Sequence, residues 1–167
     1  RLSGGQAVRS STAAGFHQHC FTAPSGFGQS VRAGDNLVVW IYIPSGTTPN
    51  EIMLQWHDGT SWNHRAYWGS DYTGWGTEGT ASRYRIGNVP TARDTWVKLV
   101  VPANLVGMQG STAFGVAYGF QQTNAGGTIY WDHTAIYHDE EIVYVNQFYE
   151  KNASTGEGTA HYYFNGQ

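Results

Sequence analysis

The segment EIMLQWHDGTSWNHRAYWG, residues 51–69, contains two runs of β-favouring residues on either side of Asp58-Gly59. Asp-Gly is typical of the tight turns that join neighbouring antiparallel strands. The segment therefore predicts a β-hairpin. Its pairing register decides which side chains share a face of the sheet.

Two registers are open for this hairpin. A two-residue turn would place Gln55 opposite Trp62 and would mix polar and apolar side chains on both faces. A three-residue loop would place Trp56 opposite Trp62 and Leu54 opposite His64. The second register separates the two kinds of side chain better, and we therefore expect it.

In that register, one face of the hairpin looks like core and the other like a solvated, hydrogen-bonding surface. The core face carries Ile52, Leu54, Trp56, Trp62, His64, Ala66 and Trp68. The solvated face carries Glu51, Met53, Gln55, His57, Asn63, Arg65 and Tyr67. We expect Trp56, Trp62 and Trp68 to be buried packing residues, because large aromatic side chains supply most of the area that a small β core buries.

Similar short runs fill the rest of the chain, separated by turn residues such as Pro44-Ser45-Gly46. We expect strands near residues 16–22, 36–43, 51–57, 62–68, 82–86, 96–101, 113–121 and 128–137. Short strands at this spacing predict an all-β fold, an antiparallel β-sandwich of the jelly-roll type. The order of the strands does not follow from the sequence.

The composition agrees with this fold and limits the classes of partner that the protein can bind. Charged residues make up 13% of the chain, about half the roughly 25% of an average globular domain, while aromatic residues reach 15%. The formal net charge of −3 provides no basic stripe for nucleic acid or for an anionic membrane surface. We expect neither partner, and no insertion into a membrane, because no apolar run approaches the roughly 20 residues of a membrane helix.

The single cysteine, Cys20, allows no disulfide framework within the chain and is expected to be a packing residue. The chain begins at Arg1 without a methionine or a signal peptide. We therefore expect it to be part of a larger polypeptide.

Aromatic faces beside hydrogen-bonding side chains are what a protein needs to bind a sugar. We expect Tyr67, Tyr72 and Trp75 to be stacking platforms, the last two in the Gly-rich segment 69–79. An equally open alternative is that this loop folds over the sheet edge with Trp75 as its plug. The expected hydrogen-bonding residues are Gln55, His57, Asn63, Arg65, Arg83 and Arg85.

The arginines raise the question of which sugar is bound. Arg83 and Arg85 alternate with Tyr84 and Ile86 and therefore share a strand face. If that face continues to Arg65, it would suit a carboxylated or sulfated sugar, and otherwise it is an ordinary solvated face. In the run 114–120, small residues alternate with large ones, which would leave a shallow trough for a ligand or for a packed neighbour.

Three segments resemble a carbohydrate-binding-module-like jelly-roll domain of large bacterial Rhs/YD-repeat proteins. They are GFHQH at residues 15–19, the hairpin residues 51–59 with 64–69, and WVKLVVP at residues 96–102. The resemblance covers residues 15–138, and the ending YYFNGQ, residues 162–167, is similar to the opening of a YD repeat. It implies a sandwich domain over residues 1–138 followed by a hairpin-like tail over residues 139–167.

The resemblance also implies a role in polysaccharide or oligosaccharide binding, a structural calcium ion, and an extracellular or cell-surface location within a larger secreted protein. Asp132 matches a late-strand aspartate that ligates calcium in such domains. An alternative metal site at the histidines, beginning with the His17 and His19 pair, has no supporting spacing elsewhere.

We expect no enzymatic activity. A glycosidase needs two carboxyl groups placed about the scissile bond, and no acid pair is evident although Glu51, Asp71 and Glu78 lie near the aromatic hairpin in sequence. The sequence thus predicts a non-catalytic carbohydrate-binding module. A structural spacer within a repeat shell is the alternative, and a glycan-active enzyme is a less favoured one.

Overall fold

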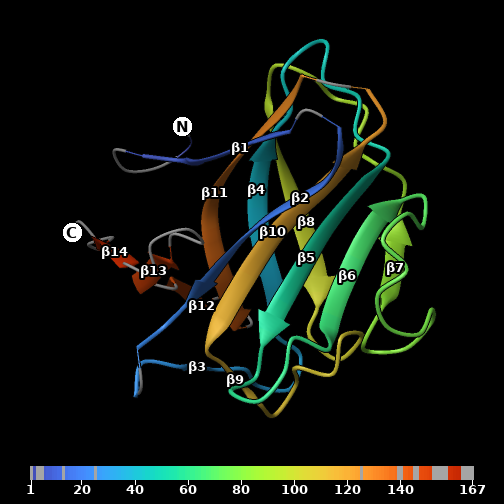
Figure 1. Cartoon of the computed structure of the whole chain (residues 1–167). Helices are drawn as coiled ribbons and strands as arrows, with labels where there is room; N and C mark the ends of the chain where they lie inside the picture. The colour runs from blue at the N-terminus through green and yellow to red at the C-terminus, as the bar shows by residue number, and fades with distance from the viewer. Residues whose placement is uncertain are drawn as a thin grey trace.

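The computed structural model describes residues 2, 6–12, 14–24, 26–124, 126–138, 141–144, 147–151 and 158–162, with side chains described only up to residue 138. It is an all-β protein in which two sheets pack face to face, as predicted (Figure 1). Within the described ranges there is no helix long and apolar enough to cross a membrane.

The first sheet has the order β1-β11-β4-β8, and the second has the order β14-β13-β2-β10-β5-β6-β7. The first sheet consists of β1 (Val8–Thr12), β11 (Gly127–His138), β4 (Asn36–Tyr42) and β8 (Trp96–Pro102), with β12 (Glu141–Tyr144) paired to β11. The second consists of β14 (Gly158–Tyr162), β13 (Gln147–Lys151), β2 (Gly15–Thr22), β10 (Gly115–Gln122), β5 (Glu51–His57), β6 (His64–Gly69) and β7 (Tyr84–Gly87). Strands β3 (Gln29–Ser30) and β9 (Thr112–Ala113) pair separately.

The connectivity is that of a jelly roll. Strands β1, β4, β8 and β11 lie in one sheet, and β2, β5, β6 and β10 lie in the other, so that most connections cross between the sheets. Strand β7 is additional and pairs parallel to β6, unlike the remaining pairs, which are antiparallel.

The prediction counted the strand at residues 82–86 among the eight and missed β1. Strand β1 has the sequence VRSST and lacks an apolar alternation. Its inward residue Ser10 is nevertheless fully buried, because its Oγ accepts a hydrogen bond from Nε1 of Trp131 at 2.9 Å. The inward position of β1 is thus filled by a hydrogen-bonded polar side chain, whereas the other strands place apolar side chains there.

The core lies between the two sheets and is built from alternate residues of their strands. Trp131 of β11 stacks on Tyr118 of β10, with 5.2 Å between the ring centroids, and so joins the sheets. Phe120, Ile41 and Leu54 fill neighbouring positions and are fully buried. Aromatic and branched side chains in such numbers account for the stability of a chain without a disulfide.

The hairpin of β5 and β6 forms as predicted, but in a different register. Trp56 lies opposite His64, Leu54 opposite Ala66, and Ile52 opposite Trp68. The loop is longer than predicted because Asp58 organises it: one carboxylate oxygen accepts the backbone N–H groups of Thr60 and Ser61 at 2.8 and 2.7 Å. The shift is two residues, so every strand side chain keeps its predicted face.

The difference in register changes the predicted position of Trp62. Trp56 and Trp68 are buried in the core as predicted, but Trp62 precedes β6 and lies outside the core cluster. Its ring packs beside His57, with 4.9 Å between centroids, and against the position where a side chain at Gly115 would extend. The prediction of a core Trp62 is therefore wrong.

The predicted hairpin-like tail, residues 139–167, contains β12, β13 and β14 in its described parts. Strand β12 pairs with β11, and β13 pairs with β2. Residues 163–167, on which most of the predicted YD-repeat similarity rests, lie outside the described residues.

Candidate functional site

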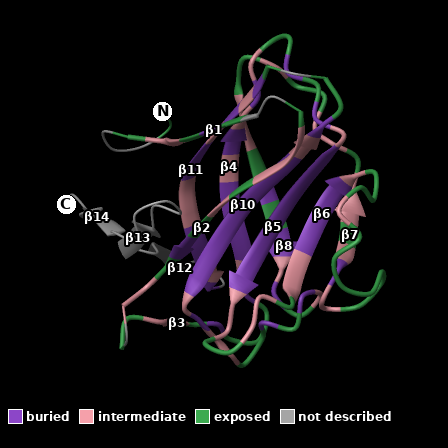
Figure 2. Cartoon of the chain, viewed as in Figure 1, coloured by how far each residue is buried: buried purple, intermediate pink, exposed green. Residues whose placement is uncertain are grey.

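The outer face of the second sheet, predicted to be solvated, is buried along its middle strands β5 and β10 (Figure 2). Glu51, Met53 and Gln55 of β5 and Tyr67 of β6 all point to this side and are buried. They are buried because the segment between β6 and β7, residues 70–83, lies over them. We call this segment the 70–83 loop.

Glu51 ties the loop to the sheet. One of its carboxylate oxygens accepts the backbone N–H groups of Tyr72 and Thr73 at 2.6 and 3.0 Å. The other accepts the hydroxyl of Thr73 at 2.9 Å. A charged acceptor makes such hydrogen bonds strong, so the start of the loop is fixed to the middle strands of the sheet.

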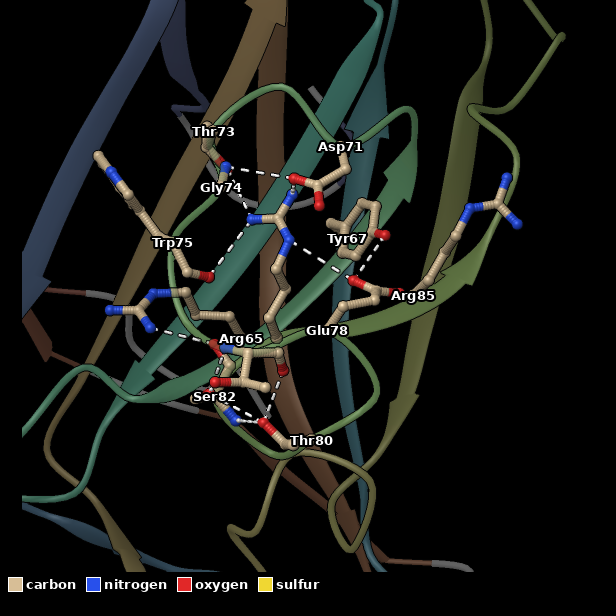
Figure 3. A network of polar contacts seen from close by, with 12 residues as sticks. Arg65, Tyr67, Asp71, Thr73, Gly74, Trp75, Glu78, Thr80, Ser82 and Arg85 are labelled. Carbon is tan, nitrogen blue, oxygen red and sulfur yellow. Dashed lines mark hydrogen bonds and ion pairs between the residues drawn. The ribbon is translucent and has the colours of Figure 1, made fainter.

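Arg83, at the other end of the loop, is buried and lies among three carboxylates. Its guanidinium pairs with Asp71, and its nitrogens lie 3.5 Å from carboxylate oxygens of Glu51 and of Glu78. It also donates to Oγ1 of Thr73 at 2.8 Å. Figure 3 shows Asp71, Thr73 and Glu78 converging in this network. Both ends of the loop therefore meet in one cluster of charges, in which Glu51 and Arg83 are buried and Asp71 and Glu78 are exposed.

Tyr67 belongs to the same cluster. Its hydroxyl donates to Glu78 at 2.8 Å, and the Arg83 guanidinium lies 4.4 Å from the centre of its ring. Burial, with help from the hydrogen bond to Glu78, raises the pKa of Tyr67 to about 12. The prediction of Tyr67 as a stacking platform is wrong, since an internal cation covers its ring and the side chain is only 2% exposed.

A second chain of hydrogen bonds holds the predicted polar residues. Gln55 donates to the side-chain oxygen of Gln18 and accepts from Nε of Arg65, both at 2.8 Å. Arg65 also donates to Asn63 at 3.0 Å. It donates to the carbonyl of Ser82 at the same distance (Figure 3). Burial and the neighbouring Arg83 lower the pKa of Arg65. Of these predicted ligand-binding residues, Asn63 is exposed and Gln55 is buried.

The three arginines do not form one accessible surface. Arg83 is buried, whereas Arg85 is exposed and donates to the carbonyl of Gly69 at 3.0 Å and to Asn88 at 2.9 Å. The register places Arg85 opposite Tyr67, so Arg85 lies on the same outer face as Arg65, and alternation puts Arg83 on that face too. Arg83 is turned to the neighbouring carboxylates and is not accessible, so the expected arginine surface for an acidic sugar is interrupted there.

His57, at the end of β5, remains half-buried beside the loop that joins β5 to β6. Its Nδ1 accepts the backbone N–H of Gly59 at 3.1 Å, and its ring contacts Trp62.

Two aromatic side chains of the loop stay at the surface, as predicted. Tyr72 is 53% exposed and Trp75 is 40% exposed. The ring of Trp75 meets Phe16 edge to face at 5.1 Å, and Phe16 in turn lies over Gly119. Both readings of this loop thus hold in part: it covers the sheet, and it presents its aromatic rings to solvent.

The trough predicted along β10 is filled. A side chain at Gly119 would meet the Phe16 ring at 2.4 Å, and one at Gly115 would meet Trp62 at 3.1 Å. The small residues of β10 are therefore spaces for packed aromatic neighbours. The packing role of Phe16 was not predicted from the sequence. Phe16 lies at the start of β2 on the outer face of the sheet, and an aromatic residue in that position was a signal for such packing.

Asp132, the predicted calcium ligand, is buried at a bulge of β11. One carboxylate oxygen accepts the N–H of Leu2 and the other that of His133, both at 2.7 Å. No group of three or more His, Cys, Asp or Glu side chains gathers as a metal site in the described part of the chain. Calcium takes six to eight oxygens, which can include backbone carbonyls, and the calcium ion stays a prediction.

His17 and His19 share a face, as expected, with 3.0 Å between their Nε2 atoms. That face points toward the opposite sheet, since their partners Phe120 and Tyr118 belong to the core. The pair does not form a larger metal cluster with other described residues.

In comparisons with known proteins, no family model and no curated protein matches the chain.

Proposed function

We propose that this protein binds carbohydrate without modifying it, with Tyr72 and Trp75 as the stacking residues. The observation that carries the proposal is the combination of two exposed aromatic side chains with a loop whose underside is fixed by buried charges. A sugar ring offers a C–H face that packs on an aromatic ring and hydroxyls that need hydrogen-bonding partners.

The buried network supports a recognition role because it makes the loop rigid. A buried ion cluster adds little net stability, since desolvation of the charges offsets much of their attraction. Such a cluster does hold the chain in one conformation. Ligand binding then loses less conformational entropy than it would with a mobile loop. Gly76 contributes to the same closure: its backbone has φ +82°, and a side chain there would meet the carbonyl oxygen of Ser82 at 2.4 Å.

The charges around Trp75 favour a neutral sugar. Three guanidinium groups, those of Arg65, Arg83 and Arg85, share this face with the three carboxylates of Glu51, Asp71 and Glu78, so their formal charges cancel. Asp71 and Glu78 are also exposed and can accept hydrogen bonds from sugar hydroxyls. These balanced charges leave no surplus cation for an anionic sugar, so the proposal departs from the acidic-sugar alternative.

The first test is a glycan-array screen of the whole chain, with calcium and with a chelator, followed by titration of the best neutral ligand. Trp75→Ala and Tyr72→Ala are expected to weaken binding about tenfold or more while the melting temperature stays within a few degrees. Phe27→Ala is the matched control, because Phe27 is an equally exposed aromatic residue in the loop between β2 and β3. Equal binding by all the variants would contradict the proposed site. A loss of binding on chelation would support the predicted calcium ion.

A structural spacer is the second candidate, and one observation favours it. Most polar groups on the outer face of the second sheet, such as Gln55 and Arg65, already bond to one another. A folded protein that binds nothing across a broad array would support this spacer function. Membership of a larger secreted polypeptide belongs to either proposal and is tested by locating the intact parent protein.

A further inference from the structure

A row of aromatic side chains crosses the first sheet, on the side of the molecule away from the 70–83 loop. Arg9 of β1 lies opposite Tyr130 of β11, Tyr130 lies opposite Tyr42 of β4, and Tyr42 lies opposite Trp96 of β8. The row therefore runs perpendicular to the strands and spans the whole width of this sheet. We call these four residues the cross-strand row.

The cross-strand row belongs to the outer face of the sheet. Its neighbours along the strands, Ile129, Trp131 and Ile41, point inward and are fully buried in the core. Because side chains alternate along a strand, the row must point outward. Its three aromatic residues are half-buried and Arg9 is exposed.

Contacts within the row fix the rings. Tyr42 lies between the other two aromatic residues, 5.6 Å from Trp96 and 6.0 Å from Tyr130 by ring centroids. Asp94 is beside the row, where it accepts the Ser45 N–H at 2.9 Å and faces the Tyr42 hydroxyl at 3.5 Å. The rings are thus held in place before any ligand arrives.

The aromatic surface continues beyond the row. In the next register position, Trp40 lies between Asp132 and Lys98. Lys98 is exposed and its Nζ sits 4.2 Å above the centre of the Tyr137 ring. The outer face of this sheet therefore combines half-buried rings with charged groups at its margins.

We propose that the cross-strand row is a second glycan-binding site, which takes a linear oligosaccharide lying across the strands. The argument is electrostatic complementarity. The faces of the three rings are electron-rich and carry no formal charge, which suits the C–H faces of successive sugar rings. Arg9, at one end of the row, and Asp94, beside Tyr42, carry opposite charges and offer a donor and an acceptor to hydroxyls, so the whole site suits an uncharged, hydroxyl-rich chain.

This second site stands apart from the proposed function of the loop. Trp75 packs on Phe16 at the outer face of the other sheet, with the core between the two surfaces. Each site can therefore be removed without touching the other.

The test uses the whole chain and three soluble probes, cellohexaose, xylohexaose and chitohexaose. In a Tyr72→Ala/Trp75→Ala background, we expect one probe still to bind. Trp96→Ala or Tyr130→Ala should then weaken that residual binding about tenfold or more. Val100→Ala is the matched control, because Val100 is an exposed outer-face residue of the same strand β8 and lies outside the row. It should leave binding unchanged.

A measurement on the unmodified protein guards against variants that fail to fold. The indole N–H resonance of Trp96, assigned with Trp96→Phe, should shift on addition of the bound probe. If the loop variant binds none of the probes, if the Trp96 resonance does not move, or if Trp96→Ala binds as tightly as its parent, the cross-strand row is not a glycan site. A concentration-dependent dimer that Trp96→Ala abolishes would also overturn the proposal, since a second copy would then occupy the row. If Trp96→Ala and Tyr130→Ala lose binding while Tyr72→Ala and Trp75→Ala keep it, the result would support this site and contradict the loop site.

Discussion

Glu51 and Arg83 face each other inside the protein, with 3.5 Å between Oε1 and Nη2 and with side chains 0% and 1% exposed. One lies on a central strand and the other at the end of the loop that covers it. The pair is therefore the point at which the 70–83 loop is joined to the sheet. Removal of either partner would leave a buried charge with less compensation.

We predict that Glu51→Gln and Arg83→Met each lower the free energy of unfolding by about 3–5 kcal/mol. The double variant should lose clearly less than the sum of the two, because the groups interact directly. Urea denaturation of the four proteins measures this coupling. Additive losses would show that the two charges stabilise the fold separately. Arg85→Met is the control, since Arg85 is an exposed arginine on the neighbouring strand.

Tyr67 gives a prediction at alkaline pH. Its pKa is raised to about 12 in the folded protein, against about 10 for an unperturbed phenol. A raised pKa means that the folded state favours the neutral phenol, so the stability linked to Tyr67 is complete below pH 10 and is lost as the pH rises toward 12. The tyrosinate absorbance of the wild type minus that of Tyr67→Phe should titrate near pH 12. A midpoint near 10, in protein that circular dichroism shows to be folded, would contradict the burial of this hydroxyl.

Asp58 gives a prediction at acidic pH. Hydrogen bonds from Ser61 and Thr60 hold the pKa of this carboxyl well below its usual range. A lowered pKa makes its stabilising effect complete above the unperturbed value of about 3.9, and this effect is lost as the pH falls below that value. Asp58→Asn should therefore flatten the fall in melting temperature between about pH 4 and pH 2. An unchanged slope would mean that other carboxyl groups cause the acid sensitivity.

Gly69 tests the path of the chain as it leaves β6. Its φ is +97°, and a side chain there would meet the carbonyl oxygen of Asn50 at 2.1 Å. Gly69→Ala should destabilise the protein by about 2 kcal/mol or more, through backbone strain and this collision. Gly87→Ala is the matched control at the end of β7, because no atom lies within 4 Å of the position its side chain would take. Equal melting temperatures for the two variants would contradict the described backbone.

Alternation along the strands predicted much of the fold. It gave most strand positions and the correct face for Gln55, Tyr67 and Arg65, since a shift of two residues leaves faces unchanged. It missed β1, whose inward Ser10 is satisfied by a hydrogen bond from Trp131, a residue distant in the sequence. Such a long-range pairing leaves no local pattern.

The site was harder to predict because alternation assigns a face but does not show what covers it. The 70–83 loop has no periodicity, and the partners of Arg83 are scattered along the preceding sequence, from Glu51 of β5 to Glu78 within the loop. The Gly-rich composition of the loop predicted that Tyr72 and Trp75 are exposed. The position of Tyr67 in its strand did not predict that it is buried. The cross-strand row escaped notice because NLVVWIY, residues 36–42, is apolar at nearly every position and looks buried on both faces.

The most direct test of the central claim, that the protein binds a neutral glycan and leaves it intact, is an array screen followed by mass analysis of the eluted ligand. We predict reproducible retention of at least one neutral oligosaccharide, recovered at its original mass. Retention of no glycan by protein shown to be folded, or the release of shortened products, would contradict the claim.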